Sequence, residues 1–134
     1  SWVKRITVMI DGVSTNGTND LTVKIGDSGG IESTGYAASI FSNITLTVTS
    51  YTAEMGVFDT SAAAGLISGQ VILTLMNSST NTWSYQSNAR DDQGIFTVGA
   101  GTKSLSAILD RIQLTTVGGT DTFDAGSVNI VYEG

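Results

Sequence analysis

Apolar residues recur at every second position through most of this chain, and this period constrains the fold more than any other feature. Successive side chains of a β-strand point to opposite faces, so the period predicts strands with one buried face. The segments that show it are residues 6–10, 21–25, 44–51, 82–86 and 128–133. The chain is therefore expected to consist mainly of strands.

The most regular alternation lies in residues 44–51. Ile44, Leu46 and Val48 alternate there with threonines, and this apolar series is expected to face inward. Residues 70–77 are apolar on both faces in their first half, which predicts a central strand. Shorter strands are predicted at residues 95–98 and 110–117.

Turns must come from Gly, Asn, Asp and Ser, because the chain contains no proline. Helix is expected only as single turns at residues 61–66 and 105–109, and no linker divides the chain. The pattern predicts an all-β fold of about eight or nine strands in one domain, residues 1–134. An antiparallel β-sandwich of jelly-roll type is favoured over a barrel. The turn signals are Asp11-Gly12, Asn16-Gly17, Ser28-Gly29-Gly30, residues 88–94, Gly99-Ala100-Gly101 and Gly118-Gly119.

Composition excludes several functional classes. The chain has no cysteine and no histidine, which rules out disulfides, thiolate zinc sites, cysteine nucleophiles and imidazole bases. Its net charge of −6 leaves no basic footprint for nucleic acid. No apolar run is long enough to span a membrane as a helix. These observations favour a domain that binds or assembles.

The motif Gly26-Asp27-Ser28-Gly29-Gly30 matches the string around the nucleophile of chymotrypsin-like proteases. A serine becomes a nucleophile there because an imidazole accepts its proton, and this chain has none. Lys24 is the nearest alternative base, but nothing in the sequence provides the buried surroundings that would lower its pKa. The motif is predicted to be a turn, and no catalytic residue is assigned.

The acidic pair Asp91 and Asp92 is the best candidate for a cation site. Adjacent carboxylates with amide neighbours suit calcium, but the segment lacks the alternating Asp pattern of an EF-hand loop. A turn in which Arg90 neutralises one carboxylate is favoured instead, so no cofactor or metal is predicted. A pair of carboxylates for glycoside hydrolysis is arithmetically possible, but no spacing marks one.

Trp83 and Tyr85 share one face of a predicted strand. Two aromatic residues at this spacing are more often core than ligand-binding, but an outward face would let them stack on a sugar ring. The loops at residues 77–83 and 88–94 combine aromatics, amides and carboxylates, and both are expected at one end of the sandwich. The candidate ligand-binding residues are Trp83, Tyr85, Asn88, Arg90, Asp91 and Asp92.

Strings at both ends of the chain resemble a known family. The opening strings are residues 4–9, 11–18, 25–32 and 35–36, and the closing strings are residues 110–116 and 123–133. Together they resemble the C-terminal domain of tailed-bacteriophage virion proteins, such as tail fibres and tail-associated structural proteins. The likeness covers roughly the whole chain, with a weak middle at about residues 51–105. It implies a virion location and a role in receptor contact or fibre assembly, with no catalytic residues.

The leading expectation is a non-enzymatic distal module of a tail fibre or similar appendage, the C-terminal part of a longer chain. It would form a homotrimer, contact other virion proteins and bind a host surface polysaccharide. Because the domain is acidic, a neutral glycan suits it better than a phosphate-rich one. The alternative is a capsid or tail decoration or trimerisation domain without a ligand. An accessory module of a tailspike and a carbohydrate-binding module of a secreted enzyme fit less well.

Overall fold

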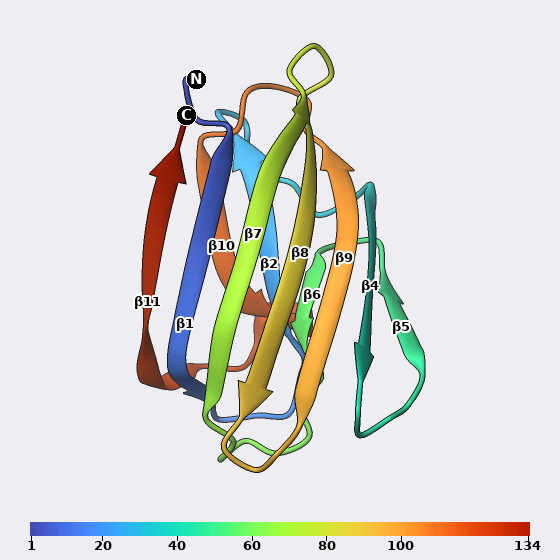
Figure 1. The fold of residues 1–134 in the computed structure, drawn as a ribbon, viewed down its shortest axis with the longest axis vertical. Coiled ribbons are helices and arrows are strands. Elements are labelled where there is room, and N and C mark those ends of the chain that lie inside the picture. Colours follow the sequence, from blue (N-terminus) through green and yellow to red (C-terminus); the bar gives the residue numbers. More distant parts are fainter.

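The computed structural model describes residues 1–134 and contains two antiparallel β-sheets that pack face to face (Figure 1). The larger sheet has seven strands. Their spatial order is β11 (Phe123–Glu133), β1 (Arg5–Thr15), β7 (Ile67–Asn77), β8 (Thr82–Asp91), β9 (Phe96–Ser104), β4 (Tyr36–Ser42) and β5 (Val48–Tyr51). In the smaller sheet, β2 (Leu21–Asp27) pairs with β10 (Arg111–Thr116), β3 (Gly30–Ile31) and β6 (Met55–Phe58). The only helical turn is η1 (Val117–Gly119).

The two halves of the chain pair in a nested order. The first strand β1 pairs with the last strand β11, β2 pairs with β10, and β4 pairs with β9. The predicted antiparallel all-β sandwich is confirmed. The strands number eleven rather than eight or nine, because β3, β4 and β6 carry no long apolar alternation.

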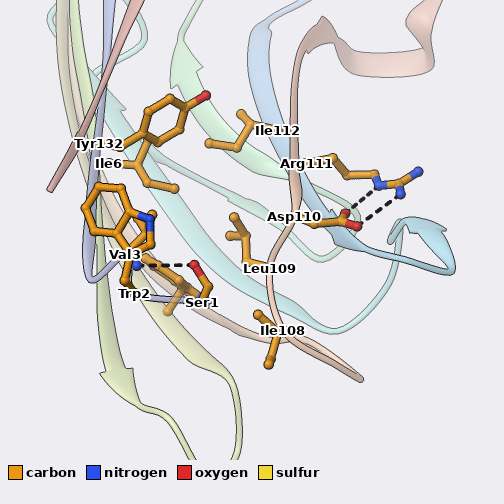
Figure 2. A pocket seen from close by; sticks show the side chains of 11 residues that line it. Ser1, Trp2, Val3, Ile6, Ile108, Leu109, Asp110, Arg111, Ile112 and Tyr132 are labelled. Carbon is orange, nitrogen blue, oxygen red and sulfur yellow. Dashed lines mark hydrogen bonds and ion pairs between the residues drawn. The ribbon is translucent and has the colours of Figure 1, made fainter. Parts of the chain in front are cut away.

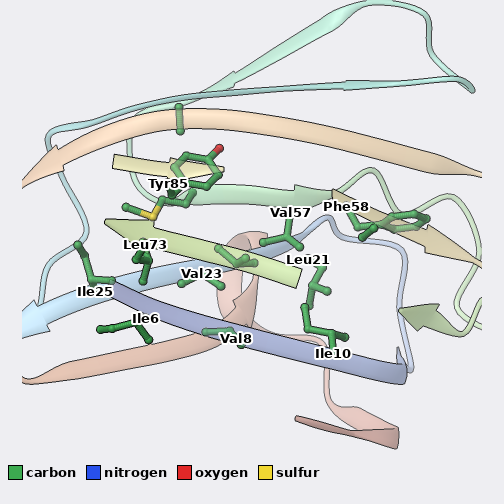
Figure 3. Close-up of a cluster of buried hydrophobic side chains, with 14 of the residues drawn as sticks. Ile6, Val8, Ile10, Leu21, Val23, Ile25, Val57, Phe58, Leu73 and Tyr85 are labelled. Carbon is green, nitrogen blue, oxygen red and sulfur yellow. The ribbon is translucent and has the colours of Figure 1, made fainter. Parts of the chain in front are cut away.

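One cluster of buried apolar side chains fills the space between the sheets (Figure 3). Val23 of β2 and Leu73 of β7 are fully buried and lie on opposite sides of this core. Complete burial of a Val, Leu or Ile side chain stabilises a fold by about 1.5–3 kcal/mol. The core contains 19 residues, so it provides a large driving force for folding without any disulfide.

The alternation predicted the inward faces of three strands correctly. Residues 6–10 lie in β1, residues 21–25 in β2 and residues 82–86 in β8, each with its apolar or aromatic series buried. Residues 70–77 form part of β7, which lies inside the larger sheet between β1 and β8. These segments place the core where the sequence indicated.

The prediction for residues 44–51 was wrong in its first half. Ile44 and Leu46 lie in the loop between β4 and β5, and the strand begins only at Val48. Leu46 has a φ of 55°, a left-handed conformation that breaks the alternation. Its N–H donates to the carbonyl of Ser42, and the Ser42 hydroxyl accepts the N–H of Thr45. These bonds close a turn, so Ile44, Leu46 and Val48 remain exposed.

The expected turn at Gly99-Ala100-Gly101 was also wrong, since these residues lie in the middle of β9. A Cβ on Gly101 would lie within 3 Å of the Tyr85 ring and of the neighbouring strand's backbone. The glycine is there because the strands and the ring leave no room for a side chain. The single helical turns predicted at residues 61–66 and 105–109 are absent.

The smaller sheet does not cover the whole inner face of the larger one. Every residue of β11 is exposed, whereas its neighbour β1 is largely buried. In Figure 1, β11 forms one outer edge of the molecule, and both termini lie at one end of it. The sandwich is therefore open along the side formed by β11 and β10.

Candidate binding cleft at the open edge

On the open side, residues of β11 that point toward the inner face of the larger sheet are exposed to solvent. In the pairing of β1 with β11, Ile6, Val8 and Ile10 lie opposite Tyr132, Ile130 and Val128. Directly paired residues of an antiparallel sheet share a face, so all six point inward. Those of β1 are buried, with at most 4% exposure, but Tyr132, Ile130 and Val128 are 55%, 36% and 43% exposed.

An apolar cleft of about 430 Å³ occupies this side (Figure 2). Residues near the N-terminus and on β11 form one wall, and the segment leading into β10 forms the other. A volume of this size is in the range of small-molecule sites. Its apolar lining residues are Trp2, Val3, Ile6, Trp83, Ile108, Leu109, Ile112 and Tyr132.

Two exposed aromatic rings line this cleft. Trp2 is 67% exposed and Tyr132 is 55% exposed, and both belong to the same wall. A Cβ on Gly134 would lie 2.8 Å from Cε3 of Trp2, so the two chain ends meet at this ring. Exposed aromatic rings in a concave apolar site are typical of surfaces that bind a partner.

The rim of the cleft carries one ion pair. The Arg111 guanidinium donates to both carboxylate oxygens of Asp110, at 2.7 and 3.2 Å. These hydrogen bonds hold the pKa of the Asp110 carboxyl below its usual range and raise the pKa of Arg111. The pair is solvent-exposed and adds a polar border to an otherwise apolar surface. This arrangement suits the binding of an apolar surface with a few polar groups at its margin.

The predicted aromatic residues lie in the core. Trp83 and Tyr85 are each only 3% exposed, as the core interpretation required, and burial raises the pKa of the Tyr85 hydroxyl. The buried Trp83 side chain is also one of the residues that line the cleft. Neither ring is placed to stack on a ligand at the outer surface.

The other four predicted residues do not lie together. Asn88, Arg90 and Asp91 belong to β8, and Asp92 follows its end. Asn88 and Arg90 lie on the solvent face, and Arg90 donates to the Asp91 backbone carbonyl at 2.9 Å rather than to a carboxylate. Asp91 is buried, and its carboxylate accepts the N–H groups of Gln93 and Ile95. The bonds of Asp91 close the turn between β8 and β9, as expected for the turn interpretation.

The Asp92 carboxylate accepts a hydrogen bond from a different loop than the Asp91 carboxylate does. Its carboxylate accepts the N–H of Leu66 at 2.9 Å and so fixes the loop that leads into β7. The chain contains no group of three or more acidic side chains placed to hold a metal ion. Asp91 and Asp92 therefore act as hydrogen-bond acceptors for backbone groups of two loops.

The expectation that the two candidate loops lie together was wrong. Residues 78–81 connect β7 to β8, and residues 92–95 connect β8 to β9, so the loops lie at opposite ends of β8 (Figure 1). Residues 88–91 also belong to the strand rather than to the loop. The six predicted residues consequently do not form one site.

The protease-like motif forms the turn between β2 and β3. The N–H of Gly29 donates to Oδ1 of Asp27 at 2.8 Å, and Gly30 has a φ of 124°. Lys24 donates to the hydroxyl of Ser33. The motif is therefore a turn, as predicted.

A buried ion pair lies near this turn. Lys103, 5% exposed, places its ammonium 2.5 Å from Oε2 of Glu32 and 5.3 Å from the centre of the Tyr36 ring. The Glu32 carboxylate also accepts the N–H and hydroxyl of Ser106. The hydrogen bond from Lys103, followed by those from Ser106, lowers the pKa of Glu32. This cluster joins β9 to the β3–β4 connection and is structural.

The residues that sequence reasoning missed lie at the two chain ends. Tyr132 belongs to a predicted strand and was expected to face inward, but the sequence does not show that the opposite sheet stops short of it. Trp2 was expected only to pack against a neighbouring segment or module. A usable signal was present in residues 128–133, where Val131 adds an apolar residue to the face expected to be polar.

No family model matches this chain, and comparisons with curated proteins and with solved structures found no similar protein. None of its helical segments has the length and hydrophobicity needed to cross a bilayer.

Proposed function

We propose that this chain is a non-enzymatic structural module of a tailed-bacteriophage virion, in a tail fibre or similar appendage. It works by binding another protein of the virion through the cleft between β10 and β11. The observation that carries the proposal is β11, a long strand at a sheet edge that is exposed on both faces and largely apolar. An uncovered apolar surface of this kind marks an interaction site.

Two further observations support a binding role over catalysis. The chain has no histidine or cysteine, and its only protease-like motif forms a turn. The cleft is lined by apolar and aromatic side chains, and its only charged groups, Asp110 and Arg111, neutralise each other at the rim. The virion location rests on the resemblance of both chain ends to tailed-phage virion proteins.

Contact with a host surface glycan is the second candidate function. The exposed rings of Trp2 and Tyr132 favour it, because aromatic rings stack on the apolar face of a sugar. Asp110 and Arg111 at the rim are suited to hydrogen-bond sugar hydroxyls. In this case the ligand site is the edge cleft and not the loops at the ends of β8.

Particles of a phage that encodes this chain test both candidates. We expect Tyr132→Ser to lower the amount of the chain in purified particles several-fold, because the cleft loses one of its two exposed aromatic rings. Val131→Thr is the matched control, since Val131 lies on the opposite face of the same strand and is 43% exposed. The readouts are quantitative mass spectrometry of purified particles and the adsorption rate to host cells.

The outcomes separate the candidates. Loss of the chain from Tyr132→Ser particles alone supports assembly through the cleft. Normal incorporation with slower adsorption supports glycan contact instead. Absence of the chain from purified wild-type particles contradicts the virion proposal, and equal behaviour of both variants contradicts the role of the cleft.

A further inference from the structure

Strand β11 lacks most of the features that usually prevent an edge strand from pairing with another chain. It is eleven residues long, contains no lysine or proline, and has no charged residue between Asp124 and Glu133. The opposite edge strand, β5, has only four residues. Long edges without charge or proline are templates for strand addition. The two edges of the larger sheet therefore differ strongly in their capacity to pair.

The free edge of β11 carries an unpaired row of backbone groups. The N–H of Ile130 donates to Oδ1 of the adjacent Asn129 at 2.9 Å rather than to β1. Alternate residues of a strand turn their N–H and C=O groups to the same side, so Val128 and Tyr132 present theirs to the free edge as well. An incoming strand could replace the bond to Asn129 without disturbing the pairing of β11 with β1.

We propose that β11 pairs in antiparallel fashion with β11 of a second copy of this chain, about a two-fold axis at Ile130. This proposal rests on the proposed function only in that both use the same edge of the larger sheet. It names a second copy of the chain as the molecule that binds there. It assigns the edge to self-association of the module.

The register follows from the regular part of the strand. Residues 127–133 pair with residues 5–11 of β1 without interruption, and irregularities begin beyond Ser127. Ile130 is the midpoint of this run, so a two-fold axis there pairs the whole run with itself. Such an axis keeps both inner faces on one side, and it places Tyr132 opposite Val128 of the second copy. About six backbone hydrogen bonds would form along the free edges.

Charge at this edge favours a second copy of an acidic chain. The net charge of −6 makes most surfaces of two copies repel each other. Three of the six basic residues, Lys4, Arg5 and Arg111, lie beside this edge or its cleft. Arg5 lies 3.9 Å from Glu133, and the proposed register places Glu133 opposite Ser127 of the second copy. No pair of like charges is brought together.

Apolar side chains lie uncovered on the inner face of β11 and beside it. An aromatic side chain presents roughly 150–250 Å² when unfolded, so the exposed parts of Trp2 and Tyr132 leave about 100 Å² or more each. With Val128 and Ile130, which are 43% and 36% exposed on the same face as Tyr132, the apolar area is roughly 300 Å². Patches of this size on proteins are often functional.

The geometry favours two copies over the three expected from the sequence. A ring of three needs contact between two different surfaces of each copy. Strand β11 is complementary to itself, whereas β5 is too short to match its length. A two-fold interface uses the same surface of both copies.

Substitution at the axis tests the pairing, because Ile130 would face Ile130 of the second copy. Ile130→Lys and Ile130→Glu each place like charges against each other, so each variant alone should be monomeric. An equimolar mixture should recover the dimer, since opposite charges then meet. Val131→Lys is the control, because Val131 lies on the other face and would oppose Asn129. Mass is measured by light scattering after size exclusion, and circular dichroism checks that each variant is folded.

We expect a wild-type mass of about 28 kDa, twice the 13.9 kDa of one chain, and half that mass for either Ile130 variant. In wild-type protein, the amides of Val128, Ile130 and Tyr132 should be protected from hydrogen exchange, which tests the pairing even if a variant fails to fold. A monomeric or trimeric wild type, unprotected amides, or a mixture that stays monomeric would overturn the inference. A monomer leaves the proposed function standing, because the cleft then remains free for a different virion protein.

Discussion

Removing the charge of Lys103 should destabilise the fold, and the structure sets the size of the effect. Lys103→Met keeps the length of the buried side chain but leaves the Glu32 carboxylate without its cation. Breaking a buried ion pair on one side costs about 3–5 kcal/mol. Glu32 is 21% exposed and keeps two hydrogen bonds from Ser106, so the loss should lie lower, at about 2–3 kcal/mol.

Thermal unfolding followed by circular dichroism measures this loss. An unfolding entropy of about 2.1 cal/mol/K per residue gives roughly 280 cal/mol/K for 134 residues. A loss of 2–3 kcal/mol then lowers the midpoint by about 7–11 °C. The double variant Lys103→Met/Glu32→Gln is the control, because it also removes the uncompensated carboxylate, and it should recover more than half of the loss.

The pH dependence gives an independent check of the same pair. The pKa of Glu32 is lowered in the folded protein, chiefly by Lys103. Its contribution to stability is therefore complete above the unfolded pKa, about 4.3, and is lost as pH falls through the folded pKa. Lys103→Met should reduce this acid-dependent loss. A midpoint unchanged to within about 2 °C, or a double variant no more stable than the single one, would show that the Lys103–Glu32 pair does not stabilise the fold.

Three other substitutions test the close packing at Gly101 and the half-buried acid Asp20. Gly101→Ala should lower the free energy of unfolding, measured in urea, by about 3 kcal/mol, because its Cβ would lie 2.2 Å from the Ala37 carbonyl oxygen. The control Gly118→Ala should lower it by only about 1 kcal/mol, because a Cβ there meets open space and only the φ of 79° is unfavourable. Equal losses would contradict the close packing assigned to Gly101. Burial raises the pKa of Asp20, so its contribution to stability is full below the unfolded pKa and is lost as pH rises through the folded pKa. The free energy of unfolding of Asp20→Asn, relative to wild type, should therefore improve between pH 3 and pH 7, and a change of the opposite sign would contradict this assignment.

The period-2 alternation predicted the fold class because it records burial directly, but it does not record which strand pairs with which. Ile6, Val8 and Ile10 become buried because β7 and β11 flank their strand and the smaller sheet covers it. Ile44 and Leu46 have the same alternation and stay exposed, because Ser42 closes a turn around them. The two segments differ in long-range contacts that a local pattern does not contain.

The predicted site failed for a reason that the sequence partly contained. Trp83 and Asn88 differ by an odd number of residues, so a continuous strand turns them to opposite faces. The turn signal in residues 88–94 suggested that the strand ended earlier, but β8 continues to Asp91. Extending the alternation through this segment would have separated the candidate residues.

The edge cleft could not be predicted from local patterns. Trp2 and Tyr132 are separated by almost the whole chain, and only the pairing of β1 with β11 brings the two ends together. Exposure of Tyr132 also depends on where the opposite sheet ends, which is at β10. Both facts are properties of the assembled sandwich.

Cryo-electron microscopy of this domain within purified particles would show directly what lies against β11. We expect a protein chain along the free edge of β11, with the Tyr132 ring covered. A domain attached to the particle through another surface, with β11 and Tyr132 open to solvent, would contradict it.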